Sequence, residues 1–151
     1  MTCIDERKRE SEMIAHSIEE LGWWGNGQNM YPTREELYLS GGLLVEDWPH
    51  ARQVTRLAVQ LFEETLPLHK LNSHALRLLE RAAFLHNTGM MVEERRHHKH
   101  SFKLIKQTQL PDFSDEERHE IACIARYHRR ALPSNDHAEF AVLNRAARKR
   151  V

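Results

Sequence analysis

Apolar residues recur along most of this chain at the spacing of an α-helix. Ile14, Ile18 and Leu21 share one helical face and predict a first helix over residues 5–21, and similar stripes recur toward the C-terminus. No segment alternates between apolar and polar residues as a half-buried strand does. No apolar run approaches the roughly 18 residues that a membrane-spanning helix requires. The pattern therefore predicts an all-α fold without a membrane span.

Cap and turn residues divide this pattern into separate helices. Serine, threonine and aspartate residues that cap helix N-termini are the expected starts, and glycine and proline are the expected ends. The starts are Thr33, Asp47, Ser73, Ser114 and Asp136. The ends are Gly22, Gly41-Gly42, Pro67, Gly89, Pro111 and Pro133. A further helix follows the polar residues 93–96 and carries Phe102 and Ile105.

Most of these helices carry an apolar stripe, and we expect the stripes to be buried. The stripe after Asp47 consists of Val54, Leu57, Ala58, Leu61 and Phe62. The stripe of the last helix consists of Phe140, Leu143 and Ala147. The expected architecture is a single helical bundle over residues 46–151, preceded by an N-terminal helical extension over residues 1–45.

Length and composition fit a small globular protein. The chain has 151 residues, of which 40% are apolar and 29% charged, and this suits one domain with its own core. The formal net charge of zero argues against a general nucleic-acid or membrane binder but leaves room for a local basic patch. Cys3 and Cys123 are too few for a disulfide framework, and the charged N-terminus lacks the apolar core of a signal peptide. We therefore expect a reduced, cytoplasmic protein in which Cys123 is a buried structural thiol.

Histidine is the unusual residue, with 11 copies. Four histidines each continue the apolar stripe of a different predicted helix: His50, His86, His98 and His128. A single inward histidine is more often a satisfied interior residue than a ligand. Four such residues favour a shared polar site, and neutral imidazole is the commonest metal ligand. His97 and His100 flank His98 and can take its place, because helix phase near a terminus is uncertain by a residue or two.

The residues around these histidines allow two interpretations each. Asn87 is either a weak, neutral metal ligand or a helix cap together with Gly89. Basic residues near the histidines suit phosphate oxygens, although a solvated helix face is the simpler interpretation. They are Lys99, Lys103, Arg126, Arg129 and Arg130. Arg126 and Arg130 are expected to share a helix face at i, i+4 spacing.

Five segments taken together resemble a known family. They are residues 50–58 (HARQVTRLA), 82–89 (AAFLHNTG), 97–101 (HHKHS), 110–118 (LPDFSDEER) and 124–130 (IARYHRR). Over residues 47–150 this combination resembles the HD domain at the C-terminus of the exopolyphosphatase and guanosine-pentaphosphate phosphohydrolase (Ppx/GppA) family. Each segment alone is a weak match, whereas the combination is specific.

The resemblance implies a metal-dependent phosphohydrolase that acts on a nucleotide or a polyphosphate-like substrate. The implied ligands of a divalent metal (Mn, Mg, Zn or Fe) are His50, His86, His98 or His97, and His128, with Asn87 at the place of the usual aspartate. Such a metal would lower the pKa of bound water and polarise a phosphoryl group. The implied phosphate-binding residues are Lys99, Arg129 and Arg130.

Two departures from the family pattern leave an alternative open. Asn87 replaces the aspartate, and the chain ends at Val151, before the helix in which the family usually carries a late aspartate. Both changes remove negative charge from the site. The alternative is a catalytically degenerate module that binds a phosphorylated ligand or a partner protein. The expected partners are a phosphorylated small molecule or nucleotide, together with either a second copy of the chain or a larger phosphatase.

Overall fold

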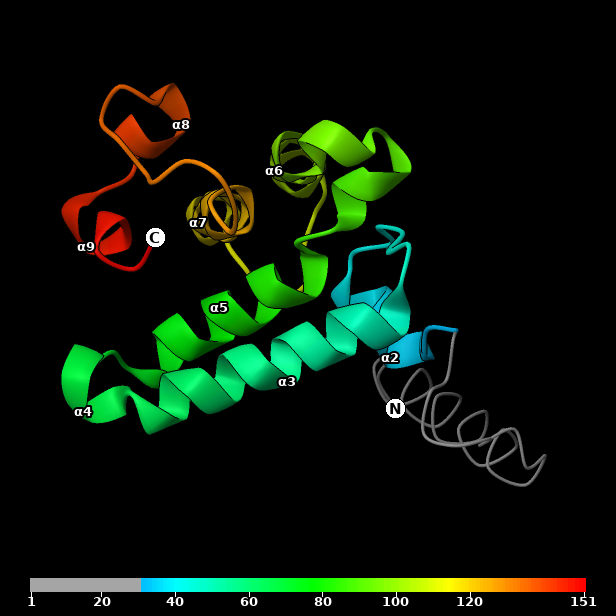
Figure 1. Ribbon diagram of the computed structural model, residues 1–151, viewed down its shortest axis with the longest axis horizontal. Helices are drawn as coiled ribbons and strands as arrows, with labels where there is room; N and C mark the ends of the chain where they lie inside the picture. Colours follow the sequence, from blue (N-terminus) through cyan, green and yellow to red (C-terminus); the bar gives the residue numbers. More distant parts are fainter. Residues whose placement is uncertain (1–30) are drawn as a thin grey trace, which may run out of the picture.

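The computed structural model describes residues 31–151, and this part of the chain contains helices and turns but no strand (Figure 1). The all-α prediction is therefore confirmed for the described residues. The helix predicted over residues 5–21 lies outside them. No helix within residues 31–151 is both long and apolar enough to cross a membrane.

The helices follow one another with short connections. In chain order they are α2 (Arg34–Leu39), α3 (Trp48–Glu64), α4 (Leu66–His69), α5 (Ser73–Leu85), α6 (His97–Gln107), α7 (Asp115–Arg126), α8 (Ala138–Ala141) and α9 (Arg145–Arg148). Two 3₁₀ turns, η1 (Thr88–Met91) and η2 (Glu94–Arg96), connect α5 to α6. The predicted capping boxes are present at Thr33 and Ser114, so the first orphan N–H groups of α2 and α7 are satisfied locally.

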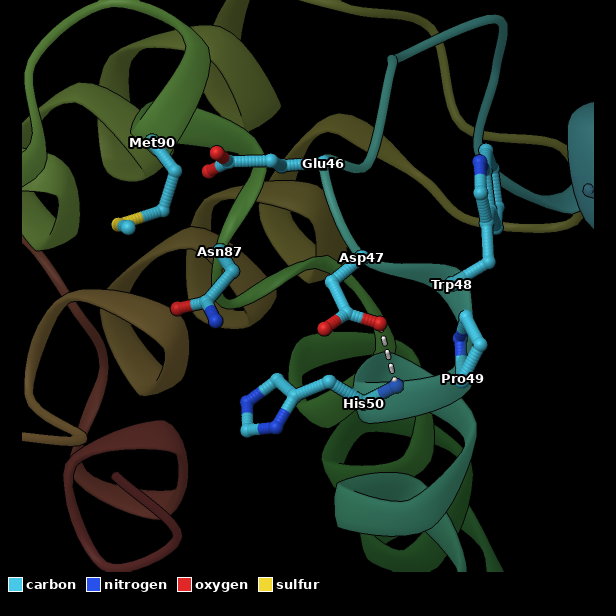
Figure 2. Close-up of a pocket in the computed structure, with 7 residues that line it drawn as sticks. All are labelled: Glu46, Asp47, Trp48, Pro49, His50, Asn87 and Met90. Carbon is cyan, nitrogen blue, oxygen red and sulfur yellow. Dashed lines mark hydrogen bonds between the residues drawn. The ribbon is translucent and has the colours of Figure 1, made fainter. Parts of the chain in front are cut away.

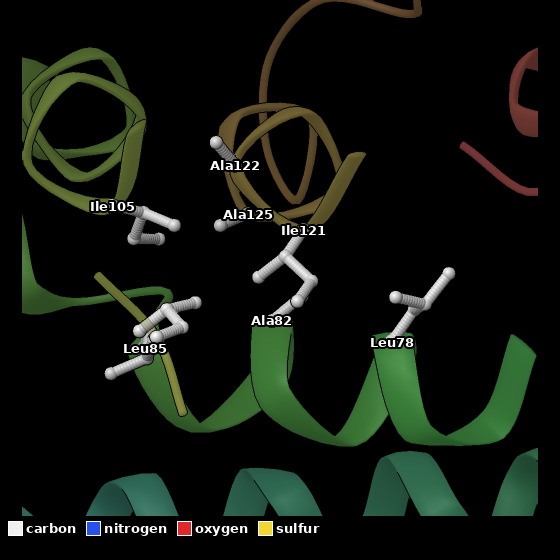
Figure 3. Packing of buried hydrophobic residues seen from close by; sticks show 8 residues of the cluster. Leu78, Ala82, Leu85, Ile105, Ile121, Ala122 and Ala125 are labelled. Carbon is white, nitrogen blue, oxygen red and sulfur yellow. The ribbon is translucent and has the colours of Figure 1, made fainter. Parts of the chain in front are cut away.

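The four longer helices form a layered bundle. α3 lies along one side of α5, and α6 and α7 pack against each other on the other side (Figure 1). Leu78 and Leu85 of α5 contribute to one core cluster with Ile105 of α6 and Ile121 of α7 (Figure 3). These four side chains are completely buried. The core therefore holds the ends of α5, α6 and α7 in a fixed relation to one another.

The apolar stripe of α3 is only partly covered, which corrects one expectation. Leu57 and Leu61 were expected to be buried, yet they are 50% and 61% exposed. The helix contacts α5 along one face only. The stripe is wider than the face of α3 that α5 covers. Within residues 31–151, the edge of the stripe that carries Leu57 and Leu61 is therefore left exposed.

The last predicted helix is two separate turns, α8 and α9. Asn144 interrupts it, because its side chain accepts a hydrogen bond from the N–H of Ala147 at 2.9 Å and so begins a new helix. The predicted apolar residues of this segment are nevertheless buried. They are Phe140, Leu143 and Ala147, which pack around Cys123 of α7.

Candidate functional site

Histidine rings from four segments come together at one end of the bundle. His50 lies in the first turn of α3, His86 directly follows α5, His97 opens α6, and His128 lies two residues beyond α7. The Nε2 atoms of His50 and His86 are 3.3 Å apart, and those of His97 and His128 are 3.2 Å apart. The rings of His86 and His128 connect the two pairs, with centroids 5.1 Å apart. We call these four residues the histidine cluster.

Backbone carbonyl groups fix the orientation of three of these rings. Nδ1 of His86, His97 and His128 each donates to the carbonyl oxygen three residues earlier, at 2.7, 2.8 and 2.6 Å. Because a carbonyl oxygen only accepts, Nδ1 carries the proton, and Nε2 of each neutral ring presents a lone pair to its neighbour. Metal-binding histidines are commonly oriented in the same way, through a hydrogen bond from the ring nitrogen that faces away from the metal.

The contact between His97 and His128 needs a cation. Two Nε2 lone pairs 3.2 Å apart repel each other unless a proton or a metal ion is shared between them. Two nitrogens bound at roughly 2.0–2.1 Å to one tetrahedral zinc ion would lie about 3.3 Å apart. The donor type and the pairwise spacing therefore suit a divalent metal. However, no three His, Cys, Asp or Glu side chains of the described residues form a complete metal-binding set, and the four rings form a row.

Burial favours the neutral form of two cluster residues, which is the form that binds a metal. His86 is only 7% exposed, and burial lowers its pKa to about 4. Burial also lowers the pKa of His128. His50 and His128 nevertheless keep solvent-exposed surface. A ligand can therefore reach the cluster from solvent.

His98 was expected to supply the third ring, but the structure places it beside the cluster, and the adjacent His97 reaches His128 instead. A step of one residue turns a side chain by about 100° around a helix. The ring of His98 meets that of His97 edge-on, with centroids 6.0 Å apart. Its Nδ1 is buried without a hydrogen-bond partner among the described residues. Burial lowers the pKa of His98 to about 4, and the nearby positive charge of Arg126 adds to this shift.

Ser101 of α6 holds the turn that carries His86. Its hydroxyl donates to the carbonyl oxygen of His86 at 2.7 Å and accepts from the N–H of Gly89 at 2.9 Å. Gly89 was expected to end the preceding helix, but α5 ends at Leu85, and Gly89 lies in η1 without a positive φ. A Cβ atom at Gly89 would lie 2.2 Å from the carbonyl oxygen of His97. The glycine is therefore required because η1 and α6 approach closely, and this approach sets His86 beside the first turn of α6.

A pocket of about 520 Å³ adjoins the cluster at His50. Figure 2 shows the side chains of Glu46, Asp47 and Asn87 around this pocket, with the ring of His50 at its lower side. One oxygen of Asp47 accepts the N–H of His50 at 2.9 Å and caps α3. Asn87 makes no side-chain hydrogen bond that caps η1. Its amide lines the pocket, and the C-cap residue of α5 is His86 and not Asn87.

Sequence reasoning missed the carboxylates of this pocket. It treated Asp47 only as a helix cap and did not single out Glu46. Both residues directly precede the turn that carries His50, and an N-cap side chain must fold back onto that turn. Negative charge near the histidines therefore comes from the residues before α3, whereas position 87 supplies a neutral amide.

The predicted phosphate-binding residues lie in different places. Arg129 follows His128, and its charge contributes to the lowered pKa of that histidine. Lys99 lines a different pocket, together with Arg126 and Glu139. Arg130 lies beyond the end of α7 and has a left-handed backbone, with φ 73°. Because α7 ends at Arg126, Arg126 and Arg130 do not share a helix face.

The fold and this site define an all-helical domain in which histidines from four helix ends meet beside an acidic pocket. Residues 45–151 match the family model described as "Ppx/GppA phosphatase, domain III". The chain therefore belongs to the Ppx/GppA phosphatase family.

Two curated proteins are similar to part of this chain. Each is named guanosine-5'-triphosphate,3'-diphosphate pyrophosphatase. The protein from Pseudoalteromonas translucida is 36% identical over 89 residues, which cover 57% of this chain and 18% of the relative. The protein from Aliivibrio fischeri is 32% identical over 83 residues, which cover 55% of this chain and 17% of the relative. The chain thus matches less than a fifth of the length of these curated relatives.

Proposed function

We propose that the histidine cluster binds a divalent metal ion and that the chain is an HD-type phosphohydrolase domain acting on a guanosine nucleotide with several phosphates. The single observation behind this proposal is the contact of the Nε2 atoms of His97 and His128, which lie 3.2 Å apart with a lone pair on each. A metal ion removes their repulsion. The names of the two relatives support a phosphorylated guanosine nucleotide as the ligand.

The residues of the site would have distinct roles. His97 and His128 would be the first pair of metal ligands. His86 would join them through Nε2, because its Nδ1 donates to the carbonyl oxygen of Ala83 and Nε2 keeps its lone pair. When bound, a divalent ion supplies positive charge that polarises a phosphoryl oxygen. The carboxylate of Glu46 in the adjoining pocket would accept a proton. Arg129 would contact phosphate oxygens.

One observation favours a second candidate, a degenerate module that binds the same ligand without hydrolysing it. Asn87 places a neutral amide where a carboxylate would bind a divalent ion more strongly. The described residues also lack a complete metal-binding set. Metal binding and catalysis are therefore tested separately.

Metal binding is tested by titrating the chelator-treated protein with Mn²⁺ and Zn²⁺ in a calorimeter. The wild type should bind about one ion, and His128→Ala should weaken binding by about tenfold or more, because it removes a partly exposed ligand without opening the core. His74→Ala is the matched control, since His74 is a surface histidine paired with Glu117. If the wild type binds neither ion, or if both variants bind as the wild type does, the metal proposal is wrong.

Hydrolysis is tested by phosphate release from guanosine 5′-triphosphate 3′-diphosphate with Mn²⁺ present. The wild type should release phosphate, and His128→Ala should not. Asn87→Asp should tighten metal binding and raise turnover, because a carboxylate adds charge to the donor set. Metal binding without turnover in both the wild type and Asn87→Asp would favour the degenerate module.

A further inference from the structure

His128 reaches the histidine cluster from a position just beyond the end of α7. The helix ends at Arg126, Tyr127 is its C-cap residue, and His128 comes next. Residues 129–132, which follow His128, are exposed. Apart from the contacts of its own ring, the position of His128 therefore depends on the α7 side of the chain, where Tyr127 lies.

The side chain of Tyr127 packs against α8. Its ring stacks on the ring of His137, with centroids 5.6 Å apart and planes inclined by 17°, and it meets the ring of Phe140 edge-on. Its hydroxyl lies 2.9 Å from Nδ1 of His137 and donates to Oε1 of Glu139 at 3.5 Å. His137 is the N-cap residue of α8, which contains Glu139 and Phe140. We call this set of interactions the Tyr127–α8 contact.

Other contacts fix α8 to the bundle, so α8 can hold Tyr127 in place. Phe140 is buried beside Cys123 of α7, and Glu139 forms an ion pair with Arg126. Burial raises the pKa of Tyr127, so its hydroxyl keeps its proton at neutral pH. The Tyr127–α8 contact therefore joins the end of α7 to a fixed segment that begins ten residues later in the chain.

The ring of His128 makes two contacts that require a fixed backbone. Its Nδ1 donates to the carbonyl oxygen of Ala125 at 2.6 Å, and its Nε2 lies 3.2 Å from Nε2 of His97. The first contact is to α7 and the second is to α6, so both distances hold only while residue 128 keeps its place between the two helices. Removing a group that orients a metal ligand commonly weakens metal binding by about 10–100-fold.

We propose that Tyr127 is a positioning residue, which sets the ring of His128 by holding the end of α7 against α8. The inference deepens the proposed function, on which its meaning for metal binding rests, because it makes α8 part of what controls the site. The orientation of His128 can be measured without a metal ion. Failure of the metal proposal and failure of this inference are therefore distinguishable.

The orientation is tested on the full chain in EDTA at about pH 8, where histidine rings are neutral. Nitrogen–proton correlation spectra of the rings show which ring nitrogen carries the proton. His128 should be protonated at Nδ1 in the wild type, and Tyr127→Leu should shift part of the population to the Nε2-protonated form. Tyr127→Phe should keep the wild-type form, because it retains the stack on His137 and the contact with Phe140. His137→Ala, which removes the stack from the α8 side, should act in the same direction as Tyr127→Leu.

Metal affinity is measured by titrating the same proteins with Mn²⁺ and Zn²⁺ without EDTA. Tyr127→Leu should weaken binding by about tenfold, and Tyr127→Phe should weaken it by less than about threefold. Tyr38→Leu is the matched control, because Tyr38 is a tyrosine of α2 that is 62% exposed. It should change neither the protonated nitrogen of His128 nor the metal affinity.

Two outcomes would overturn the inference. The first is that Tyr127→Leu and His137→Ala, at a temperature where they are folded, keep the wild-type form of His128, even if both are less stable. The second is a wild-type His128 that carries its proton on Nε2. If the wild type binds no metal but Tyr127→Leu shifts the proton of His128, the metal proposal is wrong and the positioning role of Tyr127 is supported.

Discussion

His97 and His98 are neighbours in the first turn of α6 and are both buried, yet only His97 reaches a histidine on another helix. The carbonyl oxygen of Glu94 accepts the Nδ1 proton of His97 at 2.8 Å and directs its Nε2 toward His128. His98 has no such partner for its Nδ1 among the described residues. A local hydrogen bond thus selects which of two adjacent histidines belongs to the cluster.

The buried His86 predicts how stability depends on pH when no metal is bound. Its pKa is lowered from an ordinary value of 6.5 to about 4. Above pH 6.5 the ring is neutral in both states. Between pH 6.5 and 4 the unfolded chain takes up a proton that the folded chain does not. Stability is therefore lost as the pH falls, by about 2 kcal/mol from this residue between pH 7 and 5.

Urea unfolding at pH 7 and pH 5 in the presence of EDTA measures this loss. His86→Gln is the matched variant, because it removes the titrating group and leaves the other histidines in place. The difference in unfolding free energy between the two pH values should be smaller in His86→Gln. An equal difference in both proteins would contradict the assignment to His86.

Cys123 predicts a thiol that reacts only when the chain unfolds. Its side chain is completely buried, and burial raises its pKa to about 12. The reactive thiolate is therefore almost absent at pH 8. In a Cys3→Ser background, a colorimetric disulfide reagent should label Cys123 slowly in buffer and rapidly in concentrated guanidinium chloride. Rapid labelling of the native protein would contradict the buried position.

At the scale of secondary-structure elements, the position of the cluster depends on how closely η1 approaches α6. Gly89→Ala should destabilise the protein by at least about 2 kcal/mol, because its Cβ would lie 2.2 Å from the carbonyl oxygen of His97. Ser101→Ala should cost about 1–3 kcal/mol, since it leaves a buried N–H and a buried carbonyl group without their partner.

Chemical denaturation measures both effects. Ser73→Ala is the control for Ser101→Ala, because Ser73 is an exposed residue at the start of α5, where Asn72 supplies the cap. Metal affinity should fall in the Ser101→Ala protein even at temperatures where it remains folded. If Ser101→Ala unfolds more easily yet binds metal as the wild type does, the hydrogen bonds of Ser101 do not position the histidine cluster for metal.

A buried leucine of α5 and a half-exposed leucine of α3 should lose different amounts of stability on the same substitution. Leu78→Ala should cost about 3 kcal/mol, because Leu78 is completely buried between α5 and α7. Leu57→Ala should cost less than about 1 kcal/mol, because half of Leu57 is already exposed. Equal losses in urea unfolding would indicate that the flank of α3 is covered in solution.

At the scale of the whole molecule, ion pairs join the C-terminal segment to α7, one between Glu139 and Arg126 and one between Arg150 and Glu120. Nε and Nη2 of Arg150 donate to the two carboxylate oxygens of Glu120 at 2.5 and 2.8 Å. Glu120 is only 3% exposed. Arg150→Ala should therefore cost about 2–3 kcal/mol, since it leaves a buried carboxylate without its partner.

A double-mutant cycle in urea tests this attribution. Arg150→Ala should cost clearly less in a Glu120→Gln background, where no buried charge remains. Arg145→Ala, an exposed arginine of α9, should change stability by less than about 0.5 kcal/mol. If Arg150→Ala costs the same in both backgrounds, the ion pair is not the source of its effect.

Local rules were sufficient for many of these features. The capping boxes at Thr33 and Ser114 and the cap at Asp47 involve residues within three positions of each other, so they could be predicted from spacing. The exposure of Leu57 could not, because it depends on how wide a surface α5 offers. The choice of His97 over His98 depends on where His128 lies, 31 residues further along the chain. The need for glycine at position 89 depends on how closely α6 approaches η1.

The sequence by itself determined the helical class and most helix starts and pointed to His50, His86 and His128, because these properties depend on residue spacing along one helix. Only the tertiary structure decided which imidazoles meet and that Glu46 and Asp47 border the pocket beside them. These features depend on distances between segments that are remote in the chain, and helix periodicity contains no information about such distances.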